Sequence, residues 1–206
     1  MTRLLFTTLL LLTSGLVTKA VADTEYLVVS GGPAARGFED LRRPGEQHDR
    51  WWGNFVRTAR VRMQEIHKTV PTNTRITWLV YRDAYVRRAA AEHQPLTQNV
   101  ESVTKAYPYI HLVWFRSTDE LINYINNGQS GRGNLKISGF EYFGHSNKFC
   151  FLFDYSGEII GASACYLHVK GINQLRSGIF APYAHVQSWG CNMADGEDSM
   201  YRAWKS

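Results

Sequence analysis

The sequence predicts a single α/β domain built on a mainly parallel sheet. Short apolar runs alternate with amphipathic helical segments, which is typical of parallel strands joined by helical crossovers. The length of 206 residues fits one domain, and the hydrophobic content of 44% fits a packed core. We therefore expect a three-layer sandwich in which helices cover both faces of the sheet.

The first half of the domain contains three predicted strands. Each strand is a short apolar run closed by a turn signal, and each helix has apolar residues at spacings of three and four. Pro71 and Pro95 end the first two helices. The predicted elements in order are a strand over Tyr26–Ser30, a polar loop over 34–49, a helix over Arg50–Lys68 with a solvated basic face, a strand over Ile76–Tyr81, helices over Asp83–His93 and Thr97–Tyr107, and a strand over Ile110–Phe115.

The second half begins with a helix start, since Ser117 is followed by acidic residues in the first predicted turn. Gly128 stops this helix. The remaining elements in order are a strand over Ile137–Phe143, a hairpin of Phe149–Phe153 with Glu158–Ile160, a helix over Leu167–Leu175, a strand over Tyr183–Trp189 and the start of a helix in the last 15 residues.

The first 22 residues have the composition of a secretory signal peptide. An apolar run over residues 4–17 precedes the small residues Ala20-Val21-Ala22, which form a cleavage site. The run is too short for a membrane anchor, and no later segment is apolar enough to span a bilayer. We expect a secreted or periplasmic protein in which residues 1–22 are removed and residues 23–206 form one domain.

Charge and composition argue against several classes of partner. Removal of Arg3 and Lys19 from the 23 basic residues leaves 21 against 18 acidic residues, a formal net charge of +3. This weak excess favours neither a nucleic acid nor a membrane as partner after signal cleavage. The histidines show no metal-ligand spacing, and no phosphate-loop or dinucleotide fingerprint is present. We expect no metal and no cofactor.

Three cysteines lie beyond the predicted signal: Cys150, Cys165 and Cys191. Export permits disulfides, but an odd number leaves one thiol free or paired outside the chain. Cys150 and Cys165 are near enough in the sequence to pair, which would leave Cys191 free.

Two reactive side chains follow predicted strands. His145 and Cys191 each lie just beyond such a strand, and sites in parallel sheets form at the carboxyl ends of strands. An imidazole can take the proton of a thiol and so activate it as a nucleophile. Gly144 and Gly190 precede the two residues and allow tight turns. If the two strands are neighbours, the thiol and the imidazole share one edge of the sheet.

These segments resemble those of the caspase-like cysteine peptidases, the fold of gingipains, legumains, metacaspases and clostripain. In that family one apolar strand ends in His-Gly, and a later one ends in a small residue and Cys. Ile137–His145 and His185–Cys191 match the two blocks. The resemblance covers most of residues 26 to 193. It implies a caspase-like fold and a peptidase that acts on a peptide or protein substrate.

The resemblance also assigns roles and shows departures. It makes His145 the catalytic histidine and Cys191 the nucleophile, with Ser146 and the backbone of Cys191 lining an oxyanion hole. Backbone N–H groups at the turns of Gly144 and Gly190 can also serve as oxyanion donors. The family usually has Gly where Ser146 stands. It also continues well beyond the 15 residues that follow the cysteine here, so the resemblance leaves open an incomplete domain, a minimal variant or an inactive relative. Two further candidates, for substrate binding, flank the cysteine: Trp189 and Asp195.

Two other functions compete with a cysteine peptidase. Gly144–Lys148 nearly matches the G-x-S-x-G elbow of α/β-hydrolases, but Lys148 replaces the last Gly. In that serine hydrolase Ser146 would be the nucleophile, with His168 or His185 as base and Asp154 as acid. A non-catalytic secreted binding domain of the same fold would instead use exposed aromatic residues such as Trp51, Trp52 and Trp204.

Overall fold

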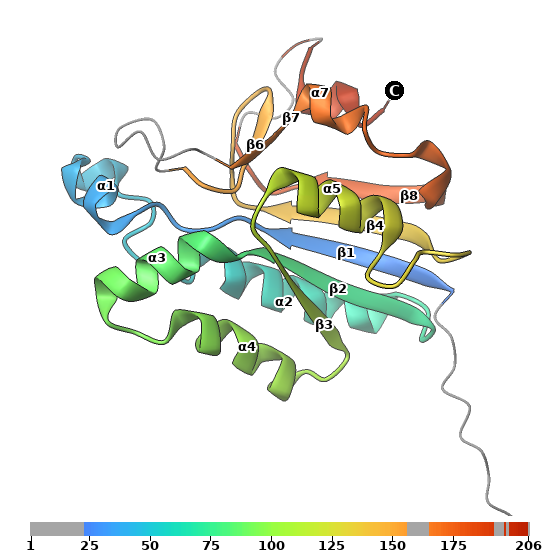
Figure 1. The fold of residues 1–206 in the computed structure, drawn as a ribbon, viewed down its shortest axis with the longest axis horizontal. Coiled ribbons are helices and arrows are strands. Elements are labelled where there is room, and N and C mark those ends of the chain that lie inside the picture. Colours follow the sequence, from blue (N-terminus) through green and yellow to red (C-terminus); the bar gives the residue numbers. More distant parts are fainter. Residues whose placement is uncertain (1–22, 156–164, 192–195, 197, 206) are drawn as a thin grey trace, which may run out of the picture.

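A five-stranded parallel sheet with the order β3-β2-β1-β4-β8 forms the centre of the molecule (Figure 1). The computed structural model describes residues 23–155, 165–191, 196 and 198–205. The five predicted strands outside the hairpin are present in this sheet, as β1 (Thr24–Ser30), β2 (Thr74–Tyr81), β3 (Ile110–Phe115), β4 (Lys136–Phe143) and β8 (Phe180–Ser188). The proposed signal peptide lies outside the described residues, and none of the helices that the structure describes has the length and hydropathy to cross a membrane.

Helices pack on both faces of this sheet, as the alternation of side chains along β1 requires. Leu27 and Val29 enter a core shared with α5, α7 and α8, whereas Tyr26 and Val28 enter a second core with α2, α3 and α4. Figure 1 shows α5 and α2 on opposite sides of the strands. The helices are α1 (Arg36–Leu41), α2 (Asn54–Thr69), α3 (Arg82–Glu92), α4 (Leu96–Ala106), α5 (Thr118–Asn127), α7 (Val169–Ile172) and α8 (Met200–Ala203).

The strand order reverses between β1 and β4. The chain runs from β1 outward through β2 to β3, then returns to the other side of β1 for β4 and β8. The connections after β1 and β4 therefore leave the carboxyl edge of the sheet in different directions, and ligand sites of parallel sheets form at such reversals. Figure 1 places α1 and the small sheet containing β6 at this end.

The predicted helix start at Ser117 is confirmed. Its hydroxyl accepts a hydrogen bond from the N–H of Glu120 at 3.2 Å, and the helix ends at Gly128, whose φ of +67° suits a residue without a Cβ.

The loop predicted over residues 34–49 is wrong in part. It contains the helix α1 and a turn of 3-10 helix over Pro44–Glu46. Phe38 is buried in a small cluster with Ala34 and Ala35, and Tyr155 packs on it edge to face at 5.6 Å. This helix depends on a contact from a distant segment, which local periodicity does not reveal.

The helix predicted over Leu167–Leu175 is also wrong in part. Leu167 belongs to strand β7 (Tyr166–His168), and only α7, one turn long, follows. Leu167 is fully buried opposite Phe151 on β6 (Cys150–Leu152), and this burial favours the strand. Strand β6 pairs on its other side with β5 (His145–Ser146), whereas the predicted hairpin partner Glu158–Ile160 lies outside the described residues.

Cys150 and Cys165, whose sequence spacing left a disulfide open, do not pair, and all three cysteines are free thiols. Cys150 lies opposite His168 in the β6–β7 pair, three positions along the strand from Cys165. Three residues of a strand span about 10 Å, and an odd offset places the two side chains on opposite faces. A disulfide needs Cα atoms within about 7 Å, so this register forbids it.

Candidate functional site

His145 sits at the carboxyl end of β4, where the main sheet passes into the small sheet. Its ring packs edge to face on Phe55 of α2 at 5.0 Å and stacks on Tyr155 at 4.4 Å. The side chain is 17% exposed, so one part of the imidazole still reaches solvent. The two aromatic rings hold the imidazole plane without using either of its nitrogens.

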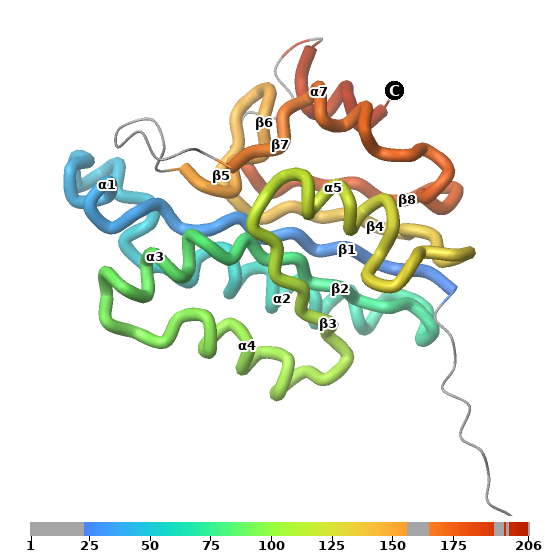
Figure 2. Tube along the Cα trace, viewed as in Figure 1, coloured from blue at the N-terminus to red at the C-terminus, as the bar shows by residue number. Residues whose placement is uncertain are grey.

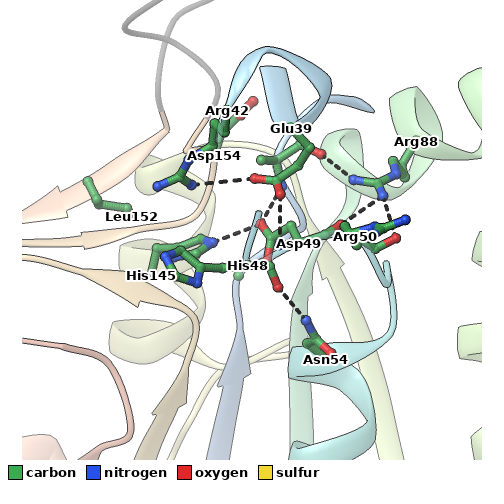
Figure 3. A network of polar contacts seen from close by, with 12 residues as sticks. Glu39, Arg42, His48, Asp49, Arg50, Asn54, Arg88, His145, Leu152 and Asp154 are labelled. Carbon is green, nitrogen blue, oxygen red and sulfur yellow. Dashed lines mark hydrogen bonds and ion pairs between the residues drawn. The ribbon is translucent and has the colours of Figure 1, made fainter. Parts of the chain in front are cut away.

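A buried carboxylate orients this imidazole. Oδ2 of Asp49 lies 2.8 Å from Nε2 of His145 and also accepts the N–H of Ala34 at 2.7 Å (Figure 3). The Asp49 side chain is only 2% exposed. A carboxylate in this position holds the proton on Nε2 and leaves Nδ1 as the basic nitrogen. Among the described residues, Nδ1 has no hydrogen-bond partner.

Two charged side chains form hydrogen bonds with the backbone of Asp49 and hold it in place. The fully buried guanidinium of Arg88 donates to the carbonyls of Ala34, Asp49 and Arg50 at 2.8, 2.7 and 3.1 Å. The carboxylate of Glu39 accepts the N–H of Asp49 at 3.0 Å (Figure 3). Both backbone groups of Asp49 are therefore bonded to side chains, which fixes the carboxylate that faces His145.

The strand that precedes Cys191 is the direct neighbour of β4, as the shared-edge prediction required. In this parallel pair Tyr142 lies opposite Ser188, an offset of 46 positions, and the same offset relates His145 to Cys191. The rings of Phe143 and Trp189 continue this register, stacked at 5.9 Å with 10° between their planes. Cys191 and His145 thus follow the ends of two paired strands at one edge of the sheet, and Cys191 is exposed. Among the described residues, no hydrogen bond joins the thiol to the imidazole.

The turns that carry the two residues are in contact. The Ser146 hydroxyl donates to the carbonyl of Cys191 at 2.5 Å. A Cβ on Gly190 would lie 2.3 Å from that hydroxyl oxygen, so only glycine allows the approach. A Cβ on Gly144 would meet the Tyr142 hydroxyl at 2.2 Å. Glycine at position 190 thus allows the two turns to approach, and glycine at position 144 leaves room for the Tyr142 hydroxyl.

The backbone donors at this edge differ in availability. The N–H of Gly190 donates to the Ser188 hydroxyl at 3.1 Å, so it is already occupied as an oxyanion donor. The N–H of Cys191 donates to no other described residue. Of these two groups, the Cys191 N–H is the one free to bind a developing oxyanion.

Trp189 forms an exposed aromatic surface next to the cysteine. Its side chain is 53% exposed, and its Nε1–H donates to Glu141 at 2.9 Å. Burial alone would raise the pKa of Glu141, but hydrogen bonds from Arg62, Tyr26 and Trp189 lower it. Arg62 is thus more than part of a solvated basic face. The other predicted substrate-binding residue, Asp195, lies outside the described residues.

The residues of the predicted serine hydrolase do not assemble. Strand β6 follows Ser146 closely, where a nucleophile elbow needs a helix. His168 caps α7 through the N–H of Lys170, and His185 contacts Gln187 at 3.0 Å. Asp154 makes two hydrogen bonds to Arg87, at 2.9 and 3.0 Å.

The tryptophans of the binding-domain alternative have different environments. Trp51 is 44% exposed, whereas Trp52 and Trp204 are partly buried against the two cores. Among the residues that the structure describes, no group of three His, Cys, Asp or Glu side chains is arranged to hold a metal ion.

The residues that support His145 have no functional signal in the sequence. Asp49 lies 96 positions before His145, in a segment taken for a polar loop, and Arg88 belongs to an ordinary helical pattern. Phe55 and Tyr155, which hold the ring, carried no signal beyond their apolar character. Comparison of the chain with protein-family models, with curated proteins and with solved structures finds no match in any of the three.

Proposed function

We propose that this chain is an exported, caspase-like cysteine peptidase in which Asp49, His145 and Cys191 act as a triad. The observation that carries the proposal is the buried Asp49–His145 pair, which lies beside a neighbouring strand end with an exposed thiol. A nucleophile, a base and a group that orients the base are the parts that this chemistry needs. Export follows from the signal-like composition of residues 1–22.

Each residue has a distinct role in the proposed reaction. Nδ1 of His145 takes the thiol proton of Cys191, and the thiolate attacks the carbonyl carbon of a peptide bond. The N–H of Cys191 binds the resulting oxyanion, and the imidazolium returns the proton to the amine as the C–N bond breaks. Water activated by His145 then hydrolyses the thioester and frees the thiol. Asp49 stabilises the imidazolium throughout.

The rate at which iodoacetamide modifies Cys191 between pH 4 and 9 tests the dyad. Peptide mass spectrometry assigns the label, with Cys150 and Cys165 as internal references, because burial raises the pKa of both thiols. A free thiol has a pKa of about 8.5. We expect Cys191 to be modified at least about tenfold faster than either reference thiol at pH 6, and this advantage to be lost in His145→Ala.

A peptide-library digest completes the test. We expect hydrolysis by the unaltered protein and none by Cys191→Ala. An ordinary pH profile in both the unaltered protein and His145→Ala would reject the dyad and favour the binding domain. Full hydrolysis by Cys191→Ala, with loss in Ser146→Ala, would favour the serine hydrolase.

A further inference from the structure

A group of basic residues lies at the amino end of the sheet, at the opposite end from His145. A hollow of about 410 Å³ opens there, between the loop after α5 and the segment before β8. In Figure 2 the yellow loop after α5 and the orange-red segment before β8 both lie at the end of the sheet away from α1. Three basic residues and no acidic residue line the hollow, which is formed by Asn127, Gly131, Arg132, Gly133, Leu135, Lys136, Arg176, Gly178 and Ile179.

The charge of Arg132 is already matched. Its guanidinium pairs with the buried carboxylate of Glu25 at 2.6 Å and donates to the carbonyls of Ile125 and Tyr124 at 3.0 Å each. Arg132 therefore anchors the loop to the core and is not free to bind a ligand. Its role is to hold the neighbouring backbone in place.

The other two cations have no acidic partner among the residues that the structure describes. The Lys136 ammonium donates to the carbonyl of Gly178. The Arg176 guanidinium donates to the Asn127 side-chain oxygen at 2.8 Å and to the Asn126 carbonyl. Among the described residues neither cation forms an ion pair, although both line the same hollow. Two positive charges that face one cavity repel each other, and an anion between them removes that cost.

The loop adds backbone donors and space. Gly131 and Gly133 have φ values of +88° and +52°, and a Cβ on either would meet no atom within 4 Å. The N–H groups of Gly131 and Gly133 donate to no other described residue. Closely spaced N–H groups without a protein partner, in turns with such φ values, are typical of anion-binding loops.

We propose that this hollow binds the oxyanion group of a phosphate or sulfate monoester. Lys136 and Arg176 supply the two charges, and the free N–H groups of the glycine loop supply neutral donors. Charge-assisted hydrogen bonds to such oxygens are among the stronger polar contacts in proteins, and arginine matches their geometry. The site shares no residue with the proposed triad, so it stands independently of peptidase activity.

A titration with inorganic phosphate tests the site directly. Amide chemical shifts are followed in the unaltered protein, with sodium chloride keeping the ionic strength constant because exposed charges are screened by salt. We expect saturable shifts at Gly131 and Gly133. The double variant Lys136→Gln/Arg176→Gln should bind phosphate at least about tenfold more weakly. Arg75→Gln is the matched control, because Arg75 lines an adjoining hollow of about 1140 Å³ but not this one.

Three results of the phosphate titration would contradict binding at this hollow. Shifts that do not saturate, that chloride reproduces, or that persist in the double variant would overturn the proposal. The single variants Lys136→Gln and Arg176→Gln keep the test valid if the double variant fails to fold. Parallel titrations with a sugar phosphate and a sugar sulfate then show which monoester the site prefers, and binding of either one supports it.

Discussion

Each end of the sheet contains a buried arginine that donates to backbone carbonyls and pairs with a glutamate, but the two arginines have different roles. At the carboxyl end Arg88 is fully buried and donates to three backbone carbonyls, and it pairs with Glu92. At the amino end Arg132 is 7% exposed, donates to two carbonyls and pairs with Glu25. Each arginine thus supports an irregular segment that must leave the sheet without losing its hydrogen bonds.

The difference lies in where each network ends. Glu25 also accepts hydrogen bonds from the hydroxyls of Thr77 and Tyr124, at 2.5 and 2.9 Å, so the amino-end network closes within the core. The Arg88 network leads through Asp49 to His145, which keeps a basic nitrogen without a described partner. A closed buried network stabilises the fold, whereas a network with one open end provides a rigid support for chemistry.

Asp49→Asn should have the largest effect at the carboxyl end. The amide favours the wrong imidazole tautomer, so peptide hydrolysis should fall by about 10³–10⁴-fold with the fold retained. Steady-state kinetics and circular dichroism measure the two quantities. Asp154→Asn is the control, because Asp154 bonds Arg87 and should change the rate little. Equal losses in both variants would mean that Asp49 has only a structural role.

Substitution of the two arginines separates stability from chemistry. Arg132→Met leaves Glu25 buried without its cation and should lower the free energy of unfolding by about 3–5 kcal/mol. Arg88→Met should cost less, about 2–3 kcal/mol, because Glu92 is 14% exposed and can be hydrated. Urea unfolding measures both losses.

The alkylation profile of Cys191 distinguishes the same two variants. The profile should change in Arg88→Met and stay as in the unaltered protein in Arg132→Met. The reason is that, of the two arginines, Arg88 alone contacts the backbone of Asp49. Identical alkylation profiles in the two variants would contradict the conclusion that Arg88 supports His145 through Asp49.

A smaller effect is expected where Trp189 meets Glu141. Trp189→Phe removes one hydrogen bond to the carboxylate and should cost about 1 kcal/mol at pH 7. The pKa of Glu141 is lower in the folded protein than its ordinary value of 4.5, so its stabilisation is complete above that value. It is lost as the pH falls through the lower folded pKa.

Urea unfolding at pH 7 and in this acid range measures the loss, which should be smaller in Trp189→Phe. Glu65→Gln serves as the control, because Glu65 is 56% exposed and should matter by less than about 1 kcal/mol. A pH dependence in Trp189→Phe as steep as in the unaltered protein would show that this hydrogen bond does not lower the Glu141 pKa.

The smallest expected effect is none. Because the β6–β7 register keeps Cys150 and Cys165 apart, a reducing agent should leave the melting temperature unchanged. A fall in the melting temperature on reduction would show that a disulfide forms.

The sequence predicted the five strands of the main sheet and most helices because their signals are local. The apolar runs that became β1 and β3 and the Ser117 cap act within a few residues, so their period and end signals suffice. The same logic failed for α1 and β7, whose structures depend on burial against distant side chains such as Tyr155 and Phe151.

The candidate site divides in the same way. The sequence by itself placed His145 and Cys191 after two strands, because strand ends and flanking glycines are local features. Only the tertiary structure decided that β8 lies beside β4 and that Asp49 orients the imidazole. Strand order and a hydrogen bond across 96 positions depend on how the helices pack on the sheet. The spacing of residues along the sequence does not determine that packing.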